Sequence, residues 1–292
     1  MHESASSPVL RVLEAGLGLS LQDRGRPGWR RFGVPPGGWM DAHAAAAAQR
    51  LLHNDPGVPL LELLLQGARL EVLEPVWLAL TGAQVEGSIP AWRAYRAAAG
   101  EIIHLRACRS GVWSYLAVEG GLQAPHFFGS ASYYARGRLG ERLAPGAELR
   151  RAPCGHYRLP PGISGRLASW SDRWDYSAPP RIEVWPGPQW HDFSNEARET
   201  FLHAEWKVSA QSDRVGYRLE GPALAARRPS LVSEPVRTGS IQVPENGQPI
   251  ITMADGPTVG GYPKIALVDA PHLAWIAQTR PGQSLRFQLI ES

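Results

Sequence analysis

The sequence predicts a mainly β protein with few short helices, and two observations carry this expectation. Glycine and proline are frequent, with 31 and 26 of the 292 residues, and both interrupt regular structure. The apolar runs between them are short, as in Leu60 to Leu65 and Ile102 to Leu105, which suits strands. We therefore expect many short strands joined by turns.

Two helices are expected within this pattern. Asp41 is a favourable N-cap, and an alanine-rich stretch from Ala42 to Leu52 follows it until Asn54-Asp55-Pro56-Gly57 ends the helix. A second short helix is expected from about Ser194 to His203. The remaining apolar runs predict strands at Leu60 to Leu65, Glu71 to Leu80, Val112 to Val118, Ile182 to Trp185, Ile241 to Val243, Pro249 to Met253, Ile265 to Val268 and Leu285 to Leu289.

The length of the chain allows two domains of ordinary size. The best candidate boundary is Ser177-Ala178-Pro179-Pro180, because adjacent prolines favour an extended connector. We expect a flexible tail over residues 1–7 and two modules over residues 8–178 and 181–292. An Asp-Arg pair followed by Gly and Arg occurs at Asp23 and again at Asp213, which indicates related halves or, equally well, two salt-bridged turns.

Composition excludes several classes of protein. Thirty basic and 27 acidic residues leave a net charge of only +3, and arginine is spread along the chain, so nucleic acid is not an expected partner. The first eight residues lack an apolar signal core and no stretch reaches the length of a membrane span, which predicts a cytoplasmic protein. Cys108 and Cys154 are expected to be inert thiols, and Cys154-Gly155-His156 is a weak metal motif, so we expect no metal.

The residues that precede the two lysines exclude two further kinds of site. Lys207 follows a tryptophan and Lys264 follows a proline, so there is no Walker A loop and no biotin attachment site. No G-x-S-x-G nucleophile elbow or H-E-x-x-H zinc motif occurs either. Lys264 instead lies in the most informative segment of the chain, Ala254-Asp255-Gly256-Pro257-Thr258-Val259-Gly260-Gly261-Tyr262-Pro263-Lys264. Adjacent glycines there permit close approach of the backbone to a ligand.

Three other segments concentrate polar residues among glycines. In residues 22–38, Asp23 lies among turn residues and Arg26 offers planar donors suited to a carboxylate, with a turn fixed by ion pairs as the alternative. This segment leads to Asp41, for which a purely capping role is equally favoured. Glu62 lies in an apolar run, where it either faces solvent or is buried with a partner. After residue 211, two further stretches contain candidate site residues. These are Arg214, Tyr217 and Arg218 in the first stretch and Gln242 in the second.

These segments resemble, in order and over nearly the whole chain, the biotin-dependent carboxyltransferase family. That family includes the C-type subunit of bacterial 5-oxoprolinase, KipA-type proteins and part of urea carboxylase. The resemblance lies in Gln22-Asp23-Arg24-Gly25-Arg26, Gly33-Val34-Pro35 to Asp41, Leu61-Glu62 with Gly67, Thr81-Gly82-Ala83, Ser212-Asp213-Arg214-Val215-Gly216-Tyr217-Arg218-Leu219, Gly239-Ser240-Ile241-Gln242-Val243-Pro244, and Asp255 to Lys264. It implies two cyclophilin-like β-barrel modules. The family usually has Gln and Thr where this chain has Pro257 and Val259.

The resemblance implies one component of an ATP-dependent 5-oxoprolinase complex, inactive without partners that resemble the A-type and B-type subunits, the latter KipI-like. ATP would be used by the complex, with no binding site located in this chain. One alternative is a carboxyltransferase acting on urea or a related amide, where biotin would take part without attachment to this chain. Another is a KipA-like regulator that binds a KipI-like kinase inhibitor. The candidate catalytic residues are Asp41, Arg214, Asp255 and Lys264.

A small amide or lactam is the expected substrate, and a second set of residues is expected to bind it. Arginine and lysine would neutralise charge that develops on its oxygen, a carboxylate would handle a proton, and a glutamine would position the amide. The candidate substrate-binding residues are Gln22, Asp23, Arg26, Glu62, Tyr217, Arg218, Gln242, Thr258, Gly260, Gly261 and Tyr262.

Overall fold

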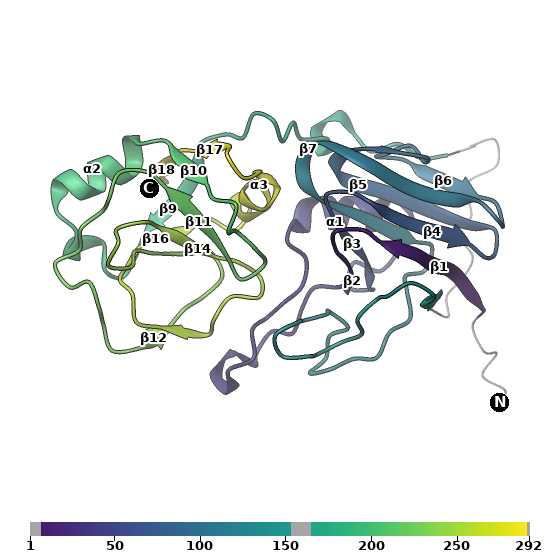
Figure 1. Cartoon of the computed structure of the whole chain (residues 1–292), viewed down its shortest axis with the longest axis horizontal. Coiled ribbons are helices and arrows are strands. Elements are labelled where there is room, and N and C mark those ends of the chain that lie inside the picture. Colours follow the sequence, from purple (N-terminus) through teal and green to yellow (C-terminus); the bar gives the residue numbers. More distant parts are fainter. Residues whose placement is uncertain (1–6, 153–164, 291–292) are drawn as a thin grey trace. The chain divides into compact units, whose positions relative to one another are not determined.

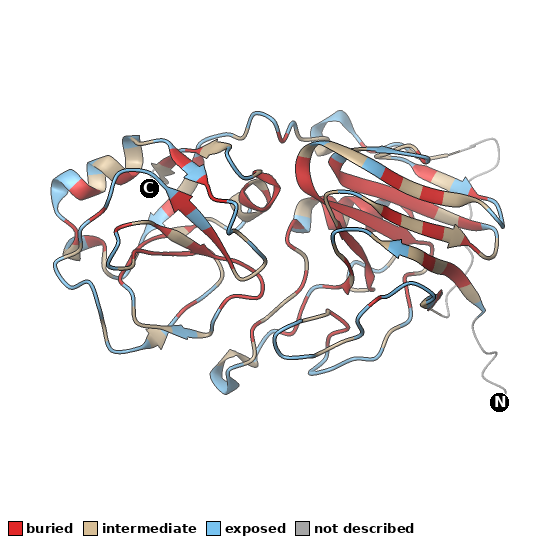
Figure 2. Ribbon diagram, viewed as in Figure 1, coloured by how far each residue is buried: buried red, intermediate tan, exposed pale blue. Residues whose placement is uncertain are grey.

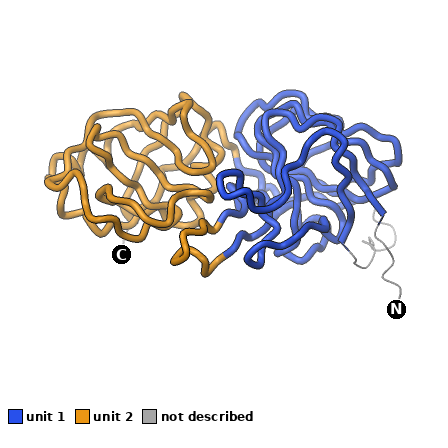
Figure 3. The backbone as a smooth tube through the Cα atoms, turned by 60° about the horizontal axis from the view of Figure 1, so that its bottom comes forward, with its two compact units in different colours: residues 1–26, 37–174 blue, residues 27–36, 175–292 orange. Residues whose placement is uncertain are grey.

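A computed structural model describes residues 7–152 and 165–290. The expected tail over residues 1–7, apart from its last residue, and the Cys154-Gly155-His156 segment lie outside the described residues. The chain divides into two compact units, coloured separately in Figure 3. Unit 1 comprises residues 1–26 and 37–174, and unit 2 comprises residues 27–36 and 175–292.

Unit 1 is built on an eight-stranded sheet that forms a half-barrel (Figure 1). Its strand order is β2-β3-β7-β4-β1-β8, and β5 pairs with both β6 and β7. The long strand β7 therefore connects most of the sheet, since it pairs with β3, β4 and β5. The strands are β1 (Pro8–Ala15), β2 (Leu19–Gln22), β3 (Leu60–Leu64), β4 (Ala68–Val72), β5 (Val76–Gly87), β6 (Ala94–Ala97), β7 (Ile102–Val118) and β8 (Glu148–Arg150).

Two strand predictions for unit 1 need correction. The single strand expected from Glu71 to Leu80 is wrong, because the structure has β4 and β5 there, separated by residues 73–75. Pro75 lies between them and cannot donate a ladder hydrogen bond, which suits a break. The separate apolar runs at residues 102–105 and 112–118 belong to one strand, β7. Register shifts between β5 and β7 let this long pair bend.

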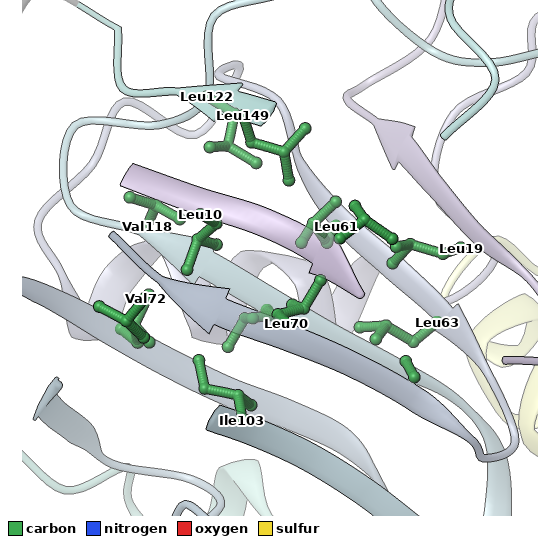
Figure 4. Close-up of a cluster of buried hydrophobic side chains, with 14 of the residues drawn as sticks. Leu10, Leu19, Leu61, Leu63, Leu70, Val72, Ile103, Val118, Leu122 and Leu149 are labelled. Carbon is green, nitrogen blue, oxygen red and sulfur yellow. The ribbon is translucent and has the colours of Figure 1, made fainter. Parts of the chain in front are cut away.

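The helix expected after Asp41 is confirmed as α1 (Ala42–Leu51). The Asp41 carboxylate accepts a hydrogen bond from the backbone N–H of Ala44 at 2.9 Å, as an N-cap does. The small alanine side chains of α1 allow it to pack closely on β5 and β7. A buried cluster of aliphatic side chains fills the space between the strands, and Figure 4 shows part of it, including Leu10, Leu70 and Ile103.

Unit 2 contains a second eight-stranded sheet, which forms a nearly closed barrel. Its order is β17-β10-β11-β14-β13-β16-β9-β18, and the pairing of β18 with β9 is parallel. A short ladder outside this sheet joins β12 (Glu234–Pro235) to β15 (Val259–Gly260). The barrel strands are β9 (Ile182–Pro186), β10 (Trp206–Val208), β11 (Gly216–Glu220), β13 (Ser240–Gln242), β14 (Ile250–Thr252), β16 (Lys264–Val268), β17 (Ser284–Leu285) and β18 (Phe287–Leu289).

The helices of unit 2 match the sequence only in part. The helix expected from about Ser194 is confirmed as α2 (Asn195–His203), with Ser194 as its N-cap. A third helix, α3 (His272–Gln278), is not predicted by the sequence, since Pro271 at its N-cap position offers no capping side chain. The strand expected from Leu285 to Leu289 is interrupted at Arg286 and forms β17 and β18.

An aromatic cluster fixes α2 on the barrel of unit 2. Phe201 of α2 stacks on Phe287 of β18 with ring centroids 4.7 Å apart, and it also contacts Trp206. The indole N–H of Trp206 donates to the carbonyl of Phe201 at 2.9 Å, so its one polar group is satisfied although the side chain is fully buried. Figure 2 shows buried positions along the strands of each unit. Among the described residues, no helix is long and apolar enough to span a membrane.

Candidate functional site

The first glycine-rich segment of unit 1 is organised around the carboxylate of Asp23. Its Oδ1 accepts hydrogen bonds from the Gly25 amide at 2.7 Å and from the hydroxyls of Ser130 and Ser132, both at 2.6 Å. Its Oδ2 accepts from the Ala131 amide at 2.7 Å. Asp23 is only 4% exposed. The carboxylate thus joins two distant chain segments and stabilises this turn by hydrogen bonds.

Gln22 and Arg26 are fully buried beside the same turn. The amide nitrogen of Gln22 donates to the carbonyl of Tyr133 at 3.1 Å. The guanidinium of Arg26 donates to the carbonyl of Ser132 and, at 3.4 Å, to that of Phe127. The amide nitrogen of Gln22 and two of the guanidinium nitrogens of Arg26 therefore donate to the main chain of residues 127–133.

Glu62 and Asp41 meet in a second buried cluster of unit 1. Oε2 of Glu62 accepts hydrogen bonds from the Met40 amide at 2.8 Å and from the hydroxyl of Tyr115 at 2.9 Å. The same hydroxyl accepts a hydrogen bond from the Asp41 amide at 2.7 Å. Glu62 is 1% exposed, so of the two alternatives raised by the sequence it is buried with partners. The network fixes the chain that enters α1.

The Tyr115 hydroxyl in this cluster is held in its neutral form. Burial raises the pKa of Tyr115 well above its ordinary value, and the nearby carboxylates of Glu62 and Asp41 raise it further. A neutral phenol can donate to one group and accept from another, which is the role it has here. Tyr115 is therefore a bridge between β7 and the start of α1 that the sequence does not predict.

In unit 2, Arg214 and Asp255 form an ion pair with two hydrogen bonds. Nε of Arg214 donates to Oδ2 of Asp255 at 2.8 Å, and Nη2 donates to Oδ1 at 3.1 Å. The Asp255 amide also donates to the carbonyl of Arg214 at 2.9 Å. Both side chains are largely buried, which makes this two-point contact strong and directional. It holds the loop that begins at residue 254 next to β11.

Lys264 is the first residue of β16 and is 5% exposed. Its ammonium donates to the carboxylate of Glu234 and, at 3.2 Å, to the carbonyl of Pro235. Its backbone N–H donates to Oε1 of Gln189 at 3.0 Å, and Nε2 of Gln189 donates to the same Glu234 oxygen at 2.9 Å. A buried ammonium needs such a counter-ion, because an unpaired charge is costly to bury.

Gln242 lies beside Lys264. The two residues are register partners in β13 and β16. Gln242 is 6% exposed, and its Nε2 is buried with no hydrogen-bond partner among the described residues. A Cβ added to Gly260 would lie 2.7 Å from this nitrogen. Gly260 in turn pairs with Glu234 in the β12–β15 ladder, so all four residues lie close together.

The other predicted residues of unit 2 are distributed differently. The hydroxyl of Tyr217 donates to the carbonyl of Ala277 at 2.7 Å, and the side chain is buried. Arg218 is exposed and Tyr262 is 43% exposed. Main-chain hydrogen bonds at Thr258 and Gly261 fasten the loop to residues 231–236. Lys264, Gln242 and Gly260 are thus the predicted residues that the structure places around an unused donor.

The comparisons with known proteins agree with this architecture. Residues 32–289 match the family model for the carboxyltransferase domain, subdomain A and B. The chain is 35% identical to the C-type subunit of 5-oxoprolinase from Escherichia coli, over 96% of this chain and 90% of that protein. It is 33% identical to the protein of the same name from Haemophilus influenzae, over 97% and 91%.

This chain belongs to the carboxyltransferase-domain family. A crystal structure of K. lactis urea amidolyase superposes on it with a TM-score of 0.90 at 28% identity, covering 99% of this chain. The chain spans only 19% of that much longer protein. The mainly β fold with two barrel modules, which the sequence resemblance implied, is confirmed for this carboxyltransferase-domain chain.

The carboxyltransferase-domain chain also uses residues that the sequence did not single out. Tyr115, Ser130 and Ser132 complete the clusters of unit 1, while Gln189 and Glu234 surround Lys264. None of them lies in a glycine-rich segment, and Glu234 is 30 residues from Lys264 in the sequence. Within the described part of the chain, no group of three or more His, Cys, Asp or Glu side chains is arranged to hold a metal ion.

Proposed function

We propose that this chain is the C-type subunit of an ATP-dependent 5-oxoprolinase complex, which converts 5-oxoproline to glutamate in the cytoplasm with A-like and KipI-like B-like partners. The observation that carries the proposal is the buried amide donor of Gln242, which has no partner among the described residues and belongs to the register partner of Lys264, itself buried. Similarity over nine-tenths of the E. coli C-type protein supports the choice of complex.

The lactam carbonyl of 5-oxoproline fits the chemistry of these donors. A carbonyl oxygen accepts hydrogen bonds, and it gains negative charge when the carbonyl carbon is attacked. Nε2 of Gln242 would donate to that oxygen, and the ammonium of Lys264 would stabilise the added charge. Preorganised donors of this kind stabilise a transition state by several kcal/mol in a site with little water. In the opening of the ring, water would add to the lactam carbonyl carbon and the C–N bond would break, which leaves the carboxylate and the amino group of glutamate. The hydrolysis of ATP to ADP and phosphate by the complex would drive this step.

A carboxyltransferase acting on urea is the second candidate. It is favoured by the TM-score of 0.90 against K. lactis urea amidolyase, and the carbonyl of urea would meet the same donors. In that case a biotin carboxylase and a biotin carrier would come from other chains. The lower sequence identity of 28% makes this the second choice.

Reconstitution of the complex tests the proposal. The purified chain is combined with its A-like and B-like partners, and ATP-dependent formation of glutamate from 5-oxoproline is measured while each component is omitted in turn. Turnover that needs all three chains is the expected result. A stable complex without turnover would contradict the enzyme assignment and favour the KipA-like regulatory function. Turnover of urea, given the biotin-bearing chains, would favour the second candidate.

A further inference from the structure

Two residues outside the glycine-rich motifs hold Lys264 in place. Glu234 accepts from the Lys264 ammonium, and Gln189 bonds both to Glu234 and to the Lys264 main chain. The three residues form a closed ring of hydrogen bonds. Lysine carries its charge on a flexible four-carbon chain, so a fixed ammonium needs contacts of this kind.

The backbone around this ring is itself fastened. The N–H of Leu231 donates to the carbonyl of Gly261 at 2.7 Å, and that of Val236 donates to the carbonyl of Thr258 at 3.0 Å. These bonds hold the segment that bears Glu234 against the loop before Lys264.

The segment that bears Gln189 lies directly against the main chain of Lys264. A Cβ on Gly187 would lie 2.2 Å from the Lys264 carbonyl, so only glycine fits there. The Gly187 amide donates to the carbonyl of Ile265 at 2.9 Å. The main-chain segments that carry Glu234 and Gln189 are therefore both held next to Lys264.

The ring leaves Lys264 capable of one more contact. An ammonium has three N–H donors, and Glu234 and Pro235 accept two of them. The third donor and the amide of Gln242 remain for an oxygen acceptor. Because Glu234 balances the charge of Lys264, the acceptor need not be an anion, which suits a neutral carbonyl.

We propose that Glu234, braced by Gln189, is a positioning residue that holds the Lys264 ammonium beside the Gln242 amide in the orientation that the ligand requires. We call the contacts of Glu234 and Gln189 with Lys264 the brace. A role for the brace in turnover rests on the proposed function, but the existence of the brace does not. Glu234 acts through Lys264 and makes no contact with the reacting carbonyl.

The composition of the chain provides a direct test of the brace. Lys207 and Lys264 are its two lysines, and Lys207 is exposed. Brief acetylation of the intact folded chain with acetic anhydride, followed by peptide mass spectrometry, gives the labelling ratio of Lys264 to Lys207. In the unaltered chain we expect this ratio to be below about 0.1, because the ammonium is buried and ion-paired.

Glu234→Gln should raise the ratio by about fivefold or more, because the uncharged amide no longer holds the ammonium. Gln189→Ala should raise it by less, since Glu234 remains. Glu205→Gln is the matched control: it removes an exposed ion pair with Arg286 in the same unit and should leave the ratio unchanged. Near-UV circular dichroism selects variants with native folding. An unchanged ratio in natively folded Glu234→Gln and Gln189→Ala chains would overturn the proposal.

A kinetic measurement on the reconstituted complex adds the link to function. Glu234→Gln should lower kcat by about tenfold with little change in KM, and Glu234→Asp should restore part of the loss. A change in KM alone would contradict a positioning role in turnover. Because the labelling ratio needs no turnover, an inactive complex with a raised ratio would reject the proposed function and leave the brace standing.

Discussion

Each unit buries a polar cluster, around Tyr115 in unit 1 and around Lys264 in unit 2, and these two clusters differ in how far their hydrogen-bonding groups are used. In unit 1, Tyr115 donates to Glu62 and accepts from the Asp41 amide, so the hydroxyl is used twice within the fold. In unit 2, Gln242 is also buried, yet its amide nitrogen has no partner among the described residues. Burial alone therefore does not distinguish the two clusters, whereas the unpaired amide nitrogen of Gln242 does. An unpaired polar atom is not confined to unit 2, because Oε1 of Gln22 in unit 1 is also buried without a hydrogen-bond partner among the described residues.

This difference predicts the largest effect at Lys264. Lys264→Met should lower turnover of the reconstituted complex by about 100-fold or more, because it removes the charge that would stabilise the developing oxyanion. The measurement is kcat/KM for 5-oxoproline at saturating ATP. Lys207→Met, which alters an exposed lysine of β10, is the matched control and should be near wild type. Equal losses in both variants would argue against a special role for the cluster of unit 2.

The cluster of unit 1 should instead respond in stability. Tyr115→Phe leaves the Asp41 amide without its acceptor and the Glu62 carboxylate without one donor. It should reduce the free energy of unfolding by about 2–3 kcal/mol, measured by urea denaturation.

Tyr95→Phe provides the comparison within the same unit. The Tyr95 hydroxyl also donates to a carboxylate, that of Glu101 at 2.8 Å, but in a partly exposed setting. Its removal should therefore cost less than about 1 kcal/mol. A Tyr115→Phe chain that unfolds like the Tyr95→Phe chain would show that the buried bridge is unimportant.

Particular elements show what the sequence can predict of the fold. α1 and α2 are recognisable because Asp41 and Ser194 mark their starts with capping side chains. α3 is not, because Pro271 gives no such signal. β4 and β5 look like one strand because apolar residues lie on both sides of the break, and the effect of Pro75 on the ladder depends on where the strands pair.

The residues of the candidate site also divide into some that the sequence can predict and others that it cannot. Lys264, Gln242 and Gly260 occur in segments whose glycines and isolated polar residues attract notice. Glu234 and Gln189 are 30 and 75 residues from Lys264, and only the pairing of β12 with β15 and the approach of residue 187 bring them together. Tyr115 looks like any aromatic residue of a buried strand, so its bridging role could not be inferred from local sequence.

A substitution at Gln242 tests the spare donor directly. Gln242→Met keeps the size of the side chain and removes a buried amide nitrogen that has no partner among the described residues, so the free energy of unfolding should be unchanged or rise by up to about 1 kcal/mol. Turnover should nevertheless fall by about tenfold, because the ligand loses a hydrogen bond. A loss of turnover without a loss of stability should therefore separate Gln242→Met from Tyr115→Phe, whose expected effect is on stability. A Gln242→Met chain that is clearly destabilised would mean that the amide serves the fold.

The smallest expected effect is on the free energy of unfolding at alkaline pH. It distinguishes the two clusters because Tyr115 in unit 1 can lose a proton there and Gln242 in unit 2 cannot. In the folded chain the pKa of Tyr115 is raised above its ordinary value of 10.0, chiefly by burial. Above pH 10 the unfolded chain therefore loses this proton while the folded chain keeps it, so stability falls as the pH rises. Tyr115→Phe lacks the titrating group, and its disadvantage relative to wild type should shrink by about 0.8 kcal/mol between about pH 9 and about pH 10.5.

Gln242→Met controls for this measurement, since it removes no ionisable group and its difference from wild type should stay flat over the same range. If the difference between wild type and Tyr115→Phe is also flat, Tyr115 ionises as readily in the folded chain as in the unfolded one. The hydroxyl would then be accessible to solvent. The contrast between the Tyr115 cluster, whose hydroxyl is used twice within the fold, and the Gln242 amide, whose nitrogen has no partner among the described residues, would then no longer hold for unit 1.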